Sequence, residues 1–145
     1  MSFQFTLQKV MELKDHEKGD AERAYTESVK EFKKTAAQLY EFLKRKEELM
    51  EEIERKLTVG LSISAIQFNE KTISYLQSEI DRLQLSTQHA RKNMNEKEKY
   101  LMYKSIDLKK YEKMKEIKQG EFLQEEKRQE SKFLDDVSVQ QFLRR

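Results

Sequence analysis

The stretch Thr58-Val59-Gly60-Leu61-Ser62 interrupts an otherwise uniformly helical sequence and decides the fold. A glycine suits the left-handed position that follows the last residue of a helix, and the hydroxyl of Ser62 is suited to accept a backbone N–H as the N-cap of the next helix. Helices joined by so short a connection lie side by side and antiparallel. The sequence therefore predicts one helix that ends near residue 57 and a second that begins near residue 63.

Apolar residues recur at steps of three and four on both sides of this turn. Such steps keep side chains on one face of an α-helix, and a sustained run of them is typical of a coiled-coil seam. The first stripe consists of Tyr25, Val29, Phe32, Ala36, Leu39, Leu43, Lys46, Met50, Ile53 and Leu57, and the second of Ile66, Asn69, Ile73, Leu76, Ile80, Leu83, Thr87, Ala90 and Met94.

Folding the chain back at the turn brings the two stripes together in pairs whose residue numbers add to 119. Leu43 then meets Leu76, and Asp15 meets Lys104 near the open end. A stutter between residues 10 and 25 is needed to carry the first stripe toward the N-terminus. The predicted fold class is all-α: a long two-helix antiparallel coiled-coil hairpin with a C-terminal helical overhang.

The expected organisation is a single coiled-coil domain over residues 1–145. Residues beyond about 116 have no partner on helix one in this register, and their apolar content predicts a docking element. The expected segments are helix one at about 3–57, the turn at 58–62, helix two at about 63–134 and a C-terminal tail at 135–145.

Composition limits the function classes. The chain is 37% hydrophobic and 39% charged, which suits a two-helix seam better than a multilayer core. Its formal charge of +2 gives no strong general field for nucleic acid or anionic lipid. There is no apolar run of membrane-spanning length and no secretory signal pattern at the start, so we expect a cytoplasmic protein without direct membrane insertion. No cysteine is present for disulfide or thiolate chemistry.

Enzyme and metal chemistry find no support in the residue pattern. His16 and His89 are not opposite each other in the predicted register, so they predict solvated histidines and not a metal site. The acidic cluster at residues 47–52 lies beside Lys and Arg at helical spacing, which is typical of a solvated ion-paired face. We therefore expect no catalytic residue, no cofactor and no metal.

Apolar and basic residues outside the stripes are the functional candidates. Phe42, Leu49, Phe68 and Tyr75 lie off the stripes in the half near the turn, where they indicate either a third apolar column that widens the seam or a groove for a partner. Near the open end, lysines at positions 109–118 interleave with apolar residues. This pattern indicates either a solvated face or a basic stalk inside an acidic protein bore.

Several motifs together resemble the FliJ family of bacterial flagellar export proteins, in a bacillus-type form. They occur in order over essentially the whole chain: Phe3-Gln4-Phe5, Leu7 to Lys14 with Glu17-Lys18, Gly60-Leu61-Ser62, Tyr111-Glu112-Lys113-Met114, and Leu134-Asp135-Asp136-Val137-Ser138 with Gln141-Phe142.

The resemblance implies a soluble, non-catalytic component of the flagellar type III export apparatus. Members of the family form an antiparallel coiled coil similar to the central stalk of rotary ATP synthases. Their partners are a FliI-like hexameric export ATPase ring, which holds the end with both termini, an FlhA-like export gate protein, and flagellar export chaperones that they help to recycle. This implies peripheral association with the cytoplasmic face of the membrane at the flagellar base.

The resemblance also supplies candidate contact residues. Those for the ATPase ring are Phe3, Leu7, Met11, Tyr111, Met114, Lys118 and Phe122. Those for the export gate are Gln38, Phe42, Leu49 and Leu76, although Arg45, Thr72 and Glu79 depart from the pattern expected there.

Three other functions fit parts of the sequence. A stalk protein of a virulence-type secretion system would share the fold and differ in its partners. A generic coiled-coil scaffold would associate in a concentration-dependent way. A nucleic-acid-binding helical arm would need a stronger positive charge than this chain carries.

Overall fold

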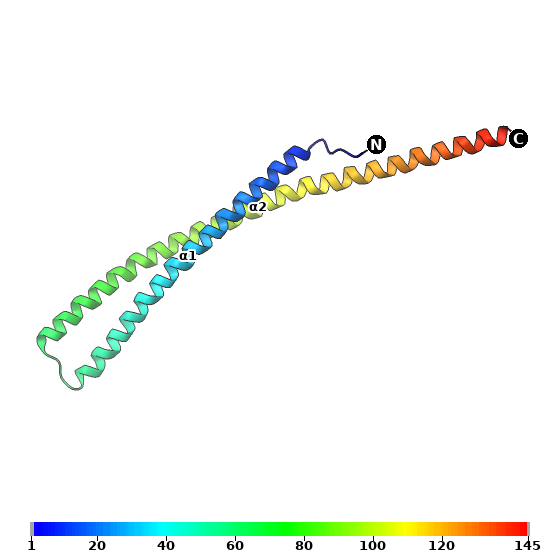
Figure 1. The fold of residues 1–145 in the computed structure, drawn as a ribbon. Coiled ribbons are helices and arrows are strands. Elements are labelled where there is room, and N and C mark those ends of the chain that lie inside the picture. The colour runs from blue at the N-terminus through cyan, green and yellow to red at the C-terminus, as the bar shows by residue number, and fades with distance from the viewer. Residues whose placement is uncertain (1, 145) are drawn as a thin grey trace. The chain divides into compact units, whose positions relative to one another are not determined.

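The computed structural model describes residues 2–144, which form two α-helices joined by one short turn (Figure 1). Helix α1 spans Gln8–Leu57 and helix α2 spans Ile63–Leu143, with 50 and 81 residues. Both are rich in Lys, Glu, Gln and Leu, which have high helix propensity, and the chain contains no proline to interrupt them. The predicted all-α helical hairpin is confirmed.

The turn between the helices has the caps that the sequence predicted. Gly60 has a φ of 107°, and its N–H donates to the carbonyl of Lys56 at 2.9 Å. The side-chain oxygen of Ser62 accepts the N–H of Ala65 at 3.1 Å. Since only glycine adopts such a φ without strain, Gly60 ends α1 and Ser62 starts α2.

Tertiary contacts divide the chain into two compact units. The first consists of the residues up to Asp20 and those from Met102 onward, and the second of Ala21–Leu101, which includes the turn. In each unit a stretch of α1 packs against a stretch of α2. The sequence analysis treated residues 1–145 as one domain; the two ends of that range, Met1 and Arg145, lie outside the described residues.

In the second unit, α2 supplies a continuous buried stripe. Its members belong to the predicted second stripe, and Ile80 and Leu83 are the most deeply buried, with 2% of their surface exposed, whereas Ile66 of that stripe is 38% exposed. The stripe includes Leu76, Ile80, Leu83, Thr87 and Ala90. The three-and-four spacing therefore predicted the packed face of α2 correctly.

The packed face of α1 is rotated from the predicted one. Ser28 and Thr35 are buried and Phe42 and Leu49 are half-buried, whereas Leu43 of the predicted stripe is 43% exposed. Met50 and Leu57, also of that stripe, are exposed as well. The predicted column that contains Leu43, Met50 and Leu57 was wrong by one residue. Phe42 and Leu49 lie in the seam itself, so they do not form a third apolar column beside it.

The rotation is tolerated because the buried hydroxyls find acceptors in their own helix. Thr35 Oγ1 donates to the carbonyls of Glu31 and Phe32 at 3.2 and 3.1 Å, and Ser28 Oγ donates to the carbonyl of Tyr25 at 2.6 Å. A buried hydroxyl without a partner would be costly, but these are satisfied.

The pairing of the two helices is also shifted from the predicted register. Lys46 donates to Gln77, and the guanidinium of Arg91 lies 5.4 Å from the centre of the Phe32 ring. Both pairs have residue numbers that add to 123. From these contacts we infer that the buried positions pair at a sum of about 122, such as Thr35 with Thr87, three more than the predicted 119.

The first unit follows the same repeat. Buried or half-buried residues occur at position 7, just before α1, and at positions 11, 14 and 18 of α1, and Leu108 of α2 is 4% exposed. With the corrected seam, the seven-residue repeat of α1 runs without a break from Leu7 to Ile53. The stutter predicted between residues 10 and 25 is therefore absent; it was a consequence of choosing the wrong column.

Both outer helix ends differ from the predicted bounds. Helix α1 begins at Gln8 and not near residue 3, and the N-terminal residues before it are not helical. Because a non-helical chain advances further per residue than a helix does, this segment reaches Phe122, beyond the predicted limit of about 116. Helix α2 does not stop near 134 but continues through most of the predicted tail to Leu143.

The register is testable by cross-linking, because the chain has no cysteine of its own. We expect Thr35→Cys with Thr87→Cys to form a disulfide readily under mild oxidation, since both side chains are buried and the inferred register pairs them. Ala36→Cys with Leu83→Cys, a pair that adds to 119, is the matched control. Faster cross-linking of the control pair, measured on non-reducing gels, would contradict the observed register.

The rotated seam also predicts unequal stability effects of two leucines. Leu83→Ala leaves a cavity at a residue that is 2% exposed, so we expect a loss of about 2–5 kcal/mol in the free energy of unfolding. Leu43→Ala should cost less than about 1 kcal/mol, because this side chain is 43% exposed. Urea unfolding followed by circular dichroism measures both losses. Similar losses would indicate that Leu43 packs in the seam and would contradict the observed rotation.

Candidate functional site

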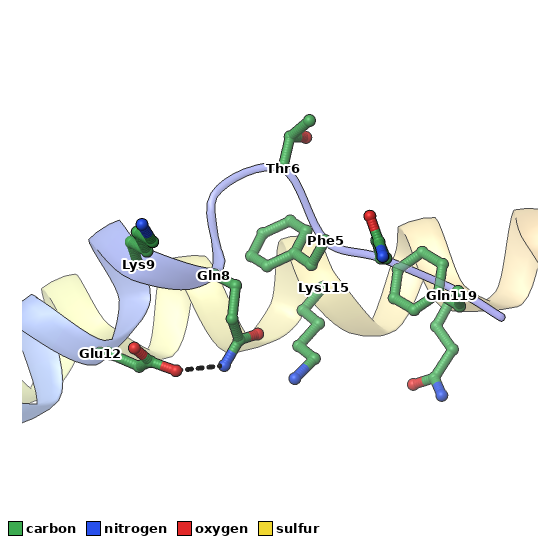
Figure 2. Close-up of a pocket in the computed structure, with 9 residues that line it drawn as sticks. Phe5, Thr6, Gln8, Lys9, Glu12, Lys115 and Gln119 are labelled. Carbon is green, nitrogen blue, oxygen red and sulfur yellow. Dashed lines mark hydrogen bonds between the residues drawn. The ribbon is translucent and has the colours of Figure 1, made fainter.

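The N-terminal segment of the first unit folds onto α2 through two aromatic residues. The rings of Phe3 and Phe122 lie 5.6 Å apart at an angle of 50°, and Phe5 is 9% exposed. Figure 2 shows Phe5 turned toward α2 and Thr6 pointing away from it. The backbone N–H of Gln8 donates to the carbonyl of Phe5 at 3.0 Å, which fixes the entry of this segment into α1.

A hollow of about 1020 Å³ lies beside this segment (Figure 2). Polar and charged side chains from both parts of the unit form much of its lining, and Gln8 donates to Glu12 at 3.2 Å within it. The lining residues are Phe3, Gln4, Phe5, Thr6, Gln8, Lys9, Glu12, Lys115 and Gln119. This open, mixed surface suits contact with a protein better than capture of a small molecule.

The residues predicted for the ATPase ring all lie in this unit, but in two different environments. Five of them are half-buried between the N-terminal part and α2: Phe3, Leu7, Met11, Tyr111 and Phe122. Met114 is 40% exposed, and Lys118 is exposed with its ammonium 3.6 Å from Glu121. Met114 and Lys118 are therefore the members of the set best placed to touch a partner without unpacking the unit.

The face of α2 that points away from α1 in this unit combines apolar and basic residues. Tyr103 is 65% exposed, Ile106 54% and Ile117 51%. Between residues 109 and 118 the chain has five lysines and only two glutamates. This face fits the predicted basic surface for an acidic partner, and its aromatic and aliphatic residues add apolar area.

Charged side chains lie inside the seam of this unit. The ammonium of Lys14 is 3.1 Å from Asp107, and that of Lys104 donates to Glu17 at 3.1 Å. The sequence analysis placed Asp15 opposite Lys104; the corrected register brings Glu17 there instead. A hydrogen bond and the nearby charge of Asp107, with a further contribution from Glu17, raise the pKa of the Lys14 ammonium above its usual value.

The raised pKa of Lys14 predicts a pH dependence of stability. The pair contributes in full below the ordinary lysine pKa of 10.5 and is lost as the pH rises through the higher folded-state value. We expect Lys14→Met to lower the urea midpoint relative to wild type at about pH 8, and the difference to shrink above about pH 11. The exposed Lys30→Met is the control; an equal difference at both pH values would contradict the prediction.

The residues predicted for the export gate lie in the second unit and are mostly turned inward. Leu76 is 6% exposed and Phe42 and Leu49 are half-buried in the seam, so only Gln38 is exposed. Gln38 lines a groove of about 510 Å³ between the helices. The other residues of the groove are Glu31, Lys34, Thr35, Arg82, Leu83, Ser86, His89 and Ala90.

Within residues 2–144, no group of three or more His, Cys, Asp or Glu residues could hold a metal ion. No helix in the same range is long and apolar enough to cross a membrane.

The comparison with known proteins identifies the family. The family model described as "Flagellar FliJ protein" matches residues 3–145. The chain belongs to the flagellar FliJ family. It is similar to the flagellar FliJ protein of Bacillus subtilis strain 168, with 38% identity over 143 residues, which cover 99% of this chain and 97% of that protein. No solved structure matches the chain.

The family match covers residues that were not among the predicted site residues. The match includes the N-terminal segment, whose Phe5 is among the most buried residues of the chain and was not among the candidates. The alternation Phe3-Gln4-Phe5 was the available signal, because such alternation is typical of extended chain with one packed face. The exposed Tyr103 and Ile106 were also not predicted; their spacing of three residues on one side of a helix was the available signal.

Proposed function

We propose that the chain is a stalk component of flagellar type III protein export that binds the hexameric ring of the export ATPase through its first unit and promotes ring assembly and ATP turnover. The family match over residues 3–145 supports a flagellar role. The observation that carries the stalk role is the exposed apolar and basic face of α2 in this unit, beside a seam closed by Phe3 and Phe122.

The physical basis of this role is asymmetry. A pair of unlike helices presents a lysine-rich side and a polar side, so it contacts the six equivalent subunits of a ring unequally. A ligand that binds one conformation of a subunit better than another shifts the population toward it. Unequal contacts therefore bias nucleotide states around the ring without any catalytic residue in the chain.

The same proposal includes a contact with the export gate, recycling of export chaperones, and a place at the cytoplasmic face of the flagellar base. For the gate, the groove that contains Gln38 is the accessible part of the predicted set. Phe42, Leu49 and Leu76 act there indirectly by holding the helices together. The flagellar match favours this assignment over a virulence-type secretion system and over a generic scaffold.

The test measures ATP hydrolysis and ring assembly by the flagellar export ATPase of the same organism, with and without the full chain. We expect stimulation by wild type and a loss of at least about tenfold in apparent affinity for the double variant Met114→Ser/Lys118→Glu, which removes apolar area and reverses one charge. The matched control, Leu85→Ser/Lys71→Glu, makes the same kinds of change at exposed positions of the second unit.

Two results would contradict the proposal. One is unchanged turnover and ring assembly on adding the wild-type chain, together with normal motility of a deletion strain. The other is an equal loss of affinity in the test and control variants, which would move the ATPase contact away from the first unit.

A further inference from the structure

One flank of the second unit exposes large apolar side chains that the seam does not use. Leu43 is 43% exposed, Met50 52%, Leu57 57% and Ile63 76%. The first three are seven residues apart, so they project from one side of α1. Leu57 and Ile63 are the last residue of α1 and the first of α2. These four residues are called the Leu43 flank below.

The packing of the two helices does not require these residues. Leu43 and Met50 directly follow the seam residues Phe42 and Leu49, and Leu57 follows the exposed Lys56, so none of the three occupies a seam position. Phe42 and Leu49 already occupy the seam at this end, so the adjacent apolar column is left on the outside. A row of exposed apolar side chains at regular spacing marks a contact surface more often than a solvated face.

We propose that the Leu43 flank binds an amphipathic helix of a partner protein whose apolar stripe is bordered by lysine or arginine. The geometry indicates a helix, because side chains seven residues apart on α1 repeat every ~10.5 Å, the repeat of a second helix laid alongside it. An extended strand repeats its side chains on a shorter period and would not match the row.

The charges around the flank indicate the basic border. Glu47 and Glu54 lie four residues after Leu43 and Met50, so each is adjacent to the row on the same side of α1. Glu70 lies on α2 seven residues before Gln77, which accepts a hydrogen bond from Lys46 between Leu43 and Met50. The Lys46 ammonium is thus already engaged, and the exposed rim is acidic.

The acidic rim argues against two other occupants. Anionic lipid headgroups would be repelled by Glu47 and Glu54, whereas surfaces that lie on membranes are rich in lysine and arginine. Two copies of the chain joined by this flank would face each other with the same glutamates. A basic helix of another protein meets neither obstacle. This inference does not rest on the role in export proposed above.

The probe is a fluorescent synthetic peptide of about three heptads with leucine at the seam positions and lysine at the flanking ones. A second peptide has glutamate in place of lysine. Fluorescence anisotropy measures the binding of each to the full chain. We expect the lysine peptide to bind and the glutamate peptide to bind at least about tenfold more weakly.

Three variants locate the binding site. Leu43→Ser/Met50→Ser should weaken binding of the lysine peptide at least about tenfold, and Glu47→Lys/Glu54→Lys should reverse the peptide preference. The matched control is Phe68→Ser/Tyr75→Ser, whose side chains are 70% and 59% exposed. They lie nine and two residues before Gln77 and so project from the other side of α2, and this variant should bind like wild type. Urea unfolding verifies that each variant remains folded.

The proposal is overturned if neither peptide binds or if the control variant loses as much affinity as Leu43→Ser/Met50→Ser. Sedimentation of the wild-type chain tests for a second copy: self-association that Leu43→Ser/Met50→Ser abolishes would identify that occupant instead. Cosedimentation with phosphatidylserine vesicles that the same variant abolishes would identify a membrane. If the chain does not stimulate the ATPase but the lysine peptide binds as expected, the proposed export role is contradicted and the proposal for the Leu43 flank stands.

Discussion

The structure depends on how two helical stripes interlock between Ala21 and Leu101. The α2 stripe with Ile80 and Leu83 is almost fully buried, whereas the α1 stripe facing it includes Ser28 and Thr35. These hydroxyls donate to carbonyls of their own helix, so burying them leaves no donor unsatisfied. The burial of the larger α2 side chains is where dispersion and the hydrophobic effect stabilise the pair.

The turn makes this pairing unique. A seven-residue repeat alone permits slips of one heptad, because each stripe maps onto itself after seven residues. Gly60 at a φ of 107° and the Ser62 cap fix where α1 ends and α2 begins, and no other register closes the same short connection. The charged pair of Lys14 and Asp107 in the first unit adds specificity more than stability, since such ions keep contact with water.

The sequence predicted the fold, the turn and the α2 stripe, because these rest on glycine conformation and on regular apolar spacing. It did not predict which column of α1 faces α2. A count of apolar residues favours Leu43 and Met50 over Thr35, and only the local hydrogen bonds of a threonine make it an acceptable seam residue. The wrong column then required a stutter and misplaced the partner of Lys104. The residues predicted to contact the ATPase lie in one unit, and their burial depends on the non-helical course of Phe3 and Phe5.

The rotation of the α1 seam has a consequence for interactions. Phe42 and Leu49 already fill the seam beside Leu43 and Met50, so the hairpin does not use the second pair for its own packing. The observed arrangement leaves that apolar area on a flank with an acidic rim. Two helices cannot enclose a third apolar column by themselves, since each presents one stripe to the other. A third helix can, and the exposed column is therefore best understood as half of an interface that another protein completes.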